Sequence, residues 1–329
     1  FAAMSGVSAA GTVTMGLIAL PSMLKRGYQK DIAVGTISAG GSLGILIPQS
    51  IIMVIFASLT GESVGRLFMG GVFPGLVLAG IFIVYIAIRC LFQPQLGPAL
   101  SREERVSFGQ KFRLVRAVIL PILLVLLVLG TIYTGICTPT EASAVGAFGA
   151  LICTIINRRF SWQMFKEATL GAFRLSVMCG WIVLGAKCFT HVYTATGAGD
   201  LILTLISGLQ VNRWLIMIAM QFILLILGCF IDPIGIMMIT LPVFTPIVVA
   251  AGFNLVWFGI LFTINMELAY ITPPFGFNLF YMKGVVPEDI TMGDIYRSIV
   301  PFVGLEMIGL ALVMAFPQIA LWLPNTMKW

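Results

Sequence analysis

Charge is scarce in this sequence. Only 10% of its 329 residues are charged, and there is one histidine. A soluble globular domain usually has about 25% charged residues, so the composition excludes that class. Hydrophobic residues make up 59% of the chain, and the mean hydropathy is +1.05. The composition therefore predicts an all-α polytopic protein that crosses a lipid bilayer several times.

Motifs for catalysis and metal binding are also absent. The sequence has no HExxH, no Walker A motif and no serine–histidine pairing, so it supports neither an enzyme nor an ATP-driven pump. The cysteines are scattered without a CxxC pair, which predicts no disulfide framework, no bound metal centre and no cofactor. These cysteines are Cys90, Cys137, Cys153, Cys179, Cys188 and Cys229.

Two apolar stretches are interrupted where a membrane helix should be continuous. Residues 40–49 read GGSLGILIPQ, and residues 269–278 read AYITPPFGFN. Glycine and proline clusters free backbone carbonyls and amides, which are tolerated at membrane depth only where they are buried in protein or line a polar site. We expect two broken transmembrane helices, over residues 32–59 and 256–281. Paired interruptions of this kind are typical of transporter binding sites.

The two interruptions belong to an internal repeat. Pro48 and Pro274 are separated by 226 positions, as are Glu62 and Glu288. Pro74 and Pro301, and the tips at Ser5 and Asp232, follow at an offset of 227. The chain begins at the first tip, so we expect the N-terminal part of the first repeat, and earlier spans, to precede it.

The repeat predicts the topology. Residues 214–231 and 234–250 form two apolar arms that meet at Asp232-Pro233, and we interpret them as a re-entrant hairpin matching an arm over residues 1–24 that ends near Pro21. Spans over 67–88, 118–137, 142–156 and 170–192, with a connector at 201–209, then leave an odd number of crossings between the breaks. The repeats should therefore be inverted.

The basic residues agree with this topology. If the turn at residues 25–31 is cytoplasmic, nearly all of the 19 Lys and Arg residues lie on the cytoplasmic side, including those of a polar surface segment at 93–116. Four fall on or near the outer face: Arg66, Lys187, Arg213 and Lys328. This sidedness explains the net charge of +6, so no nucleic-acid partner is needed.

Oxygen-bearing residues gather at the tips and breaks. Hydroxyls, amides and freed carbonyls are hard ligands that suit an alkali cation. Asp232 is the first charged candidate; Glu267 is the second, with a role left open, since it could instead pair with Lys187 or another subunit. The predicted cation-binding residues are Ser5, Ser8, Gly40, Ser42 and Gly44 in the first repeat, and Asp232, Gly235, Thr272, Gly276 and Asn278 in the second.

An anionic substrate should lie between the two tips. No Lys or Arg maps to either break, so we expect backbone amides and hydroxyls to hold the anion instead of a salt bridge. The predicted substrate-binding residues are Ser8, Pro48, Pro233, Pro273 and Pro274.

Four motifs in order resemble the large membrane subunit of tripartite ATP-independent periplasmic (TRAP) transporters, the DctM-like family. They are GSLGILIP at 41–48, TPTEA at 138–142, DP at 232–233 and ITPPFGFNLF at 271–280. The chain departs from the family at Gln49, where a second proline is usual, and at residues 266–270, where many members have small apolar residues. The substrate class therefore stays open.

The resemblance implies a fold of the ion transporter superfamily and an elevator mechanism. It implies sodium-coupled uptake of an organic acid anion, with a small membrane (Q) subunit and a periplasmic substrate-binding (P) protein as partners, in the bacterial inner membrane. The alternatives are a sodium/anion symporter that needs no binding protein, and a channel, which the lack of polar stripes on the other spans disfavours. We expect transport elements at residues 1–92 and 213–329, and a scaffold at 93–212.

Overall fold

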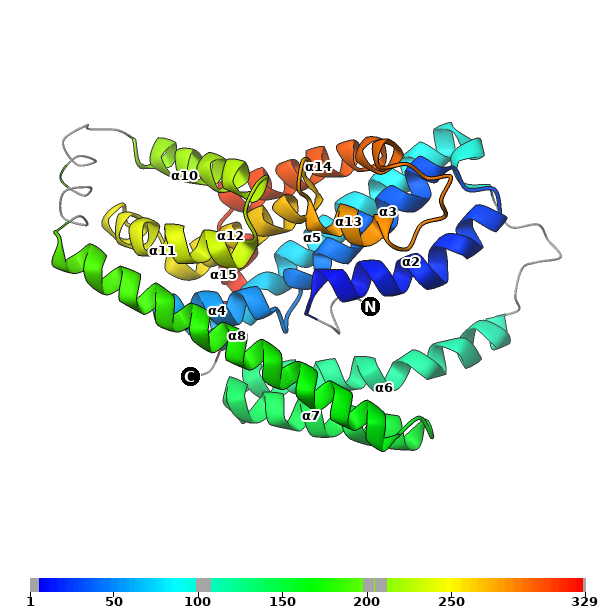
Figure 1. Cartoon of the computed structure of the whole chain (residues 1–329), viewed down its shortest axis with the longest axis horizontal. Helices are drawn as coiled ribbons and strands as arrows, with labels where there is room; N and C mark the ends of the chain where they lie inside the picture. Colours follow the sequence, from blue (N-terminus) through cyan, green and yellow to red (C-terminus); the bar gives the residue numbers. More distant parts are fainter. Residues whose placement is uncertain (1–5, 99–107, 198–203, 205–211, 328–329) are drawn as a thin grey trace. The chain divides into compact units, whose positions relative to one another are not determined.

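The computed structural model describes the chain except residues 1–5, 99–107, 198–203, 205–211 and 328–329 (Figure 1). All regular structure in the described residues is helical. Among them, five helices are long and apolar enough to cross a bilayer, which confirms a multi-pass membrane protein. They are α5 (Val64–Phe92), α7 (Pro139–Ile156), α8 (Trp162–Ala195), α11 (Pro233–Ala250) and α14 (Met292–Ala315).

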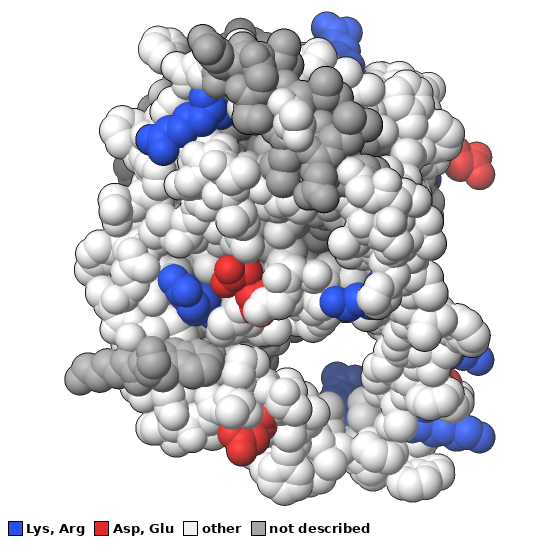
Figure 2. All heavy atoms as spheres, turned by 90° about the vertical axis from the view of Figure 1, so that its left-hand side faces the viewer, with Lys and Arg blue, Asp and Glu red and all other residues white. Residues whose placement is uncertain are grey.

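Other helices are shorter, or begin or end in polar sequence. They are α2 (Ser8–Lys25), α3 (Lys30–Ser42), α4 (Ile51–Thr60), α6 (Phe108–Tyr133), α10 (Arg213–Gly228), α12 (Leu255–Ile271), α13 (Phe277–Lys283) and α15 (Gln318–Asn325), with single 3₁₀ turns η1 (Leu43–Ile45) and η2 (Pro94–Leu96). On the face drawn in Figure 2, charged side chains are few and scattered, in keeping with the low charge content of the chain.

The chain divides into two compact units. One contains residues 1–98 and 182–324; the other contains residues 99–181 and 325–329. In the second unit α6 packs against α7. The start of α7 is a capping box, because the Thr138 hydroxyl accepts from the Glu141 amide while the Glu141 carboxylate accepts from the Thr138 amide. The span predicted over residues 142–156 is therefore present as α7, which begins at Pro139.

The first unit is built around α12. Most of its side chains are buried, and it packs against α10, α14 and α5. Phe258 and Phe262 pack on Phe56 from α4, with ring centroids 6.2 and 5.9 Å apart. The buried Trp257 indole donates to the Val313 carbonyl at 3.0 Å and so ties α12 to α14.

Both predicted breaks are present. Helix α3 ends at Ser42 and α4 starts at Ile51, while α12 ends at Ile271 and α13 starts at Phe277. The predicted arms of the second hairpin are α10 and α11, which pack on each other. One prediction was wrong: the first arm does not end near Pro21, since α2 continues to Lys25. An interior proline removes only one backbone hydrogen bond, and the helix carries on beyond it.

Candidate functional site

The first break begins as α3 tightens into η1 and then leaves helical geometry. Gln49 has φ +93°, and Ser50 caps α4 by accepting from the Met53 amide at 3.4 Å. Gly6 lies against this turn with φ +63°, and a Cβ there would overlap the Gln49 carbonyl. The start of α2 is therefore in contact with the break, and only glycine fits at the point of contact.

Ser8 is the centre of the site. It is buried, and its hydroxyl oxygen lies 3.1 Å from the Gly41 carbonyl and 2.8 Å from the Asn278 amide oxygen. The Asn278 amide nitrogen in turn donates to the Ser38 carbonyl at 3.3 Å. Residues from α2, α3 and α13 thus meet at one point, where these helices pack together (Figure 1).

This point has more acceptors than hydrogens. A serine hydroxyl has one hydrogen, yet Ser8 faces two acceptors. The hydroxyls of Thr12 and Ser38 are also buried and have no hydrogen-bond partner in the described residues. Thr12 lies against Gly41, because a Cβ on Gly41 would overlap its hydroxyl. Buried polar groups are normally paired, so the unpaired oxygens make this point a candidate ligand site.

A buried carboxyl pair adjoins the same break. The Ser42 hydroxyl lies 2.7 Å from the Ala39 carbonyl and 3.0 Å from a carboxyl oxygen of Glu306 on α14. Glu306 interacts electrostatically with Glu267 on α12. Both carboxyls are fully buried, and both oxygens of Glu267 and one of Glu306 lack a hydrogen-bond partner among the described residues.

The second break is held by hydrogen bonds to backbone carbonyls. The Thr272 hydroxyl donates to the Leu268 carbonyl at 2.7 Å, and the Gly276 amide donates to the Thr272 carbonyl at 3.0 Å. The peptide bond between Pro273 and Pro274 is cis. The Tyr296 hydroxyl donates to the Pro274 carbonyl at 3.0 Å. These contacts fix the turn against α14.

Asp232 caps a helix at the hairpin turn. Its carboxylate accepts from the Ile234 and Gly235 amides at 3.0 and 3.1 Å, so it satisfies the first-turn amides of α11. The turn lies near the end of α12: a Cβ on Gly228 would be 2.5 Å from the Ala269 Cβ, and Asp232 interacts electrostatically with Tyr270. The second tip therefore lies beside the second break.

The structure brings together only some of the predicted residues. Ser8 and Asn278 are hydrogen bonded, although they were predicted in different repeats, and Ser42 lies close by on α3. Ser5 and the connector at 201–209, apart from residue 204, lie outside the described residues. Thr12 and Glu306 were missed. An acidic residue inside the apolar run at 299–316 was a signal for Glu306, but nothing marked Thr12.

Comparisons with known proteins all point to one family of transporters. A family model described as the DctM component of tripartite ATP-independent periplasmic transporters matches residues 1–319. The chain is 34% identical to the C4-dicarboxylate TRAP transporter large permease protein DctM of Pseudomonas aeruginosa, over 99% of this chain and 75% of that protein.

Two further relatives are named as permeases. The C4-dicarboxylate TRAP transporter large permease protein DctM of Vibrio cholerae is 35% identical, over 99% of this chain and 75% of that protein. The isethionate TRAP transporter permease protein DctMQ of Oleidesulfovibrio alaskensis is 30% identical, over 97% of this chain and 49% of that protein.

Proposed function

The chain belongs to the DctM family of tripartite ATP-independent periplasmic transporters, and from this membership we propose that it is the large permease subunit that carries an organic acid anion across the bacterial inner membrane. Its relatives are named as transporter permeases, not as enzymes. We propose a periplasmic binding protein and a small membrane subunit as its partners. The isethionate relative, named DctMQ, fits the second of these.

We propose that uptake is coupled to sodium, and that the Ser8 cluster holds the ion. The observation that carries this proposal is the excess of acceptors: the Ser8 hydroxyl, the Gly41 carbonyl and the Asn278 amide oxygen share one hydroxyl hydrogen. All are neutral hard oxygens, which suit an alkali cation. The unpaired hydroxyls of Thr12 and Ser38 supply further oxygens nearby.

Substrate binding near the two tips remains our proposal for Ser8, Pro48, Pro233, Pro273 and Pro274. Some backbone amides near the tips and breaks are already hydrogen bonded and are therefore not free to bind the anion. Asp232 already satisfies two first-turn amides of α11, and Ser50 accepts from the Met53 amide of α4. An anion would therefore use backbone at the breaks themselves, next to the bound cation, whose charge it would balance.

We also propose that the two halves are inverted repeats and that the tips and breaks move together as an elevator. Support comes from the parallel construction of the halves. In each, a helix breaks at a glycine- and proline-containing turn, and the tip of a neighbouring hairpin lies against that turn. Gly6 contacts Gln49 in the first half, and the Asp232 turn lies near Tyr270 in the second.

Uptake in proteoliposomes tests the function. The purified chain with its cognate small subunit and binding protein should accumulate a radiolabelled four-carbon dicarboxylate only when sodium is higher outside. Uptake that does not need the binding protein would support the symporter alternative. Flux that runs only down the substrate gradient, with no dependence on sodium, would support a channel.

A further inference from the structure

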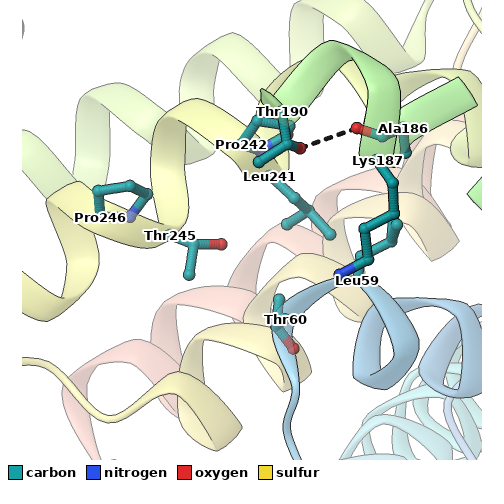
Figure 3. Close-up of a pocket in the computed structure, with 9 residues that line it drawn as sticks. All are labelled: Leu59, Thr60, Ala186, Lys187, Thr190, Leu241, Pro242, Thr245 and Pro246. Atoms are coloured by element: carbon teal, nitrogen blue, oxygen red, sulfur yellow. Dashed lines mark hydrogen bonds between the residues drawn. The ribbon is translucent and has the colours of Figure 1, made fainter. Parts of the chain in front are cut away.

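A cavity of about 160 Å³ lies between the end of α4, the C-terminal part of α8 and the middle of α11 (Figure 3). Its walls combine aliphatic side chains, such as Leu241 and Pro242, with three threonines and Lys187. A water molecule occupies about 30 Å³ in the liquid. The cavity therefore has room for a small organic molecule.

The three threonine hydroxyls differ in what they can offer a ligand. Thr60 donates to the Phe56 carbonyl at 2.8 Å, and Thr190 donates to the Ala186 carbonyl at 2.8 Å, the bond dashed in Figure 3. The Thr245 hydroxyl oxygen is buried and has no hydrogen-bond partner in the described residues. It is therefore the one hydroxyl of the lining that is not already bonded.

Lys187 supplies a positive charge that no described residue of opposite charge pairs with. Among the described residues, the ion pair is between Lys30 and Asp289, and Lys187 is in none. Figure 3 shows its side chain extending from α8 toward Leu59. Although α8 is apolar enough to span a bilayer, no described residue of opposite charge compensates this ammonium, so the lysine is available to an anionic ligand.

We propose that this cavity binds a carboxylate group of a small organic acid. The Lys187 ammonium would neutralise the carboxylate, the Thr245 hydroxyl would donate to one of its oxygens, and the aliphatic walls would contact its carbon chain. A membrane phospholipid needs a long groove for its acyl chains, so the small volume favours a free acid. The inference rests on the proposed function and adds a docking site separate from the Ser8 cluster. Thr60, which lines the cavity, is the last residue of α4 and precedes Arg66 by six positions. Because Arg66 is expected on the outer face, the cavity should lie toward the side from which substrate arrives.

Binding of radiolabelled succinate tests the proposal. The wild-type chain with its small subunit is placed in nanodiscs of zwitterionic lipid, and the succinate Kd is measured at equilibrium. Lys187→Gln should weaken binding roughly tenfold or more, the loss expected for a charge-assisted hydrogen bond. Thr245→Val should weaken it about three- to tenfold, while Thr245→Ser, which keeps the hydroxyl, should bind as the wild type does.

Two matched controls should leave the Kd unchanged. Thr240→Val removes another hydroxyl of α11, one that bonds the Ile236 carbonyl at 2.7 Å. Lys166→Gln removes another charge of α8. The proposal is overturned if Lys187→Gln and Thr245→Val bind succinate like the controls. It is also overturned if Lys187→Gln alone weakens binding. The lysine would then act by stabilising the carbonyl end of α4, and the Thr245 hydroxyl would not contact the ligand.

Two further measurements identify the ligand and show whether a failed test concerns this inference or the proposed function. Phosphatidylglycerol added to the nanodiscs should not displace succinate; displacement that depends on Lys187 would assign the cavity to lipid headgroups. If wild-type uptake depends on the binding protein and sodium but both cavity variants bind succinate normally, the inference alone fails. If succinate binds as proposed but no such uptake occurs, the proposed function alone fails.

Discussion

The Ser8 hydroxyl lies 2.8 Å from the amide oxygen of Asn278, although 270 positions separate the two residues. The same hydroxyl lies 3.1 Å from the Gly41 carbonyl, so one hydrogen serves two acceptors. A protein interior rarely leaves an acceptor unsatisfied, whereas a bound cation satisfies several at once. This arrangement brings the start of α2 together with residues that flank both breaks.

Removing the Ser8 hydroxyl should weaken sodium binding. In Ser8→Ala we expect the sodium concentration for half-maximal uptake to rise roughly tenfold, because an interaction with a charged group is worth about 1.5–3 kcal/mol. Sodium-dependence curves in proteoliposomes measure the shift. Ser58→Ala is the control, since the Ser58 hydroxyl is exposed and bonds its own helix at Val54. If the two variants gave the same curve, sodium would bind elsewhere.

A methyl group at Gly41 should disrupt the site. A Cβ there would overlap the Thr12 hydroxyl, so Gly41→Ala should lower stability by about 1–3 kcal/mol, as overpacking does, and raise the sodium requirement. Thermal unfolding in detergent and sodium-dependent uptake measure the two effects. Gly80→Ala on α5 is the matched control, because no atom lies within 4 Å of its added Cβ. Equal behaviour of the two variants would contradict the close contact with Thr12.

Neutral replacement should be tolerated at the buried carboxyls. Glu267→Gln and Glu306→Gln keep the side-chain shape while replacing two buried carboxyls that no described residue of opposite charge pairs with. We expect unfolding temperatures no lower than that of the wild type. Glu306→Ala should lower the unfolding temperature, because it leaves a cavity beside Ser42. A large loss of stability in both glutamine variants would mean that the ionised carboxyls are compensated by a partner or ion.

The Lys30–Asp289 ion pair, at 2.6 Å, should make stability depend weakly on pH. Its hydrogen bond lowers the pKa of Asp289 from 3.8 and raises the pKa of Lys30 from 10.5. The Asp289 contribution is present above about pH 4 and is lost as pH falls through its lowered pKa. The Lys30 contribution is present below about pH 10 and is lost as pH rises through its raised pKa.

Unfolding midpoints from pH 2 to 8 measure this effect. Asp289→Asn should flatten the acid side of the profile slightly, and added salt should reduce the difference, because both side chains are exposed. Glu288→Gln, which removes the neighbouring carboxylate, should retain the wild-type slope. A profile that Asp289→Asn leaves unaltered would show that the pair contributes nothing measurable.

Cysteine labelling tests the inverted repeat. With the native cysteines replaced, Gln29→Cys and Ala250→Cys place single thiols at exposed positions before the first broken helix and at the end of the second hairpin. In sealed cells an impermeant maleimide should label Ala250→Cys only, with Gln29→Cys labelled after the cells are opened. Labelling of both in sealed cells would contradict the predicted topology.

The sequence was sufficient to locate the breaks. Residues 43–50 and 272–276 interrupt their helices because proline and glycine clusters deprive the backbone of helical hydrogen bonds, a local effect that needs no knowledge of neighbours. The capping box at Thr138 is also a local feature, because a threonine followed three residues later by a glutamate satisfies both backbone amides without distant contacts. The end of α2 was not predictable, because a proline inside a helix weakens it without always ending it.

The partners within the site depend on packing, which one sequence does not specify. Offset matching put Ser8 and Asn278 into separate copies, but α13 packs on both α2 and α3 and brings them together. Thr12 has no local signature, since a threonine on an apolar helix is common, and only the contact with Gly41 distinguishes it. Glu306 was detectable as an acid in an apolar run, whereas its contact with Ser42 was not.

The bond between Trp257 and Val313 gives the molecule an optical reporter. Trp257 is 1% exposed, whereas Trp162, Trp181, Trp214 and Trp322 are 36–72% exposed. With Trp329, which lies outside the described residues, replaced by phenylalanine, the Trp257 fluorescence should resist both iodide in the water and brominated acyl chains in the bilayer, which quench the other four. The emission that survives both quenchers therefore reports on the junction of α12 and α14, and a shift of that emission during turnover would show, without any added label, when the packing around this junction changes.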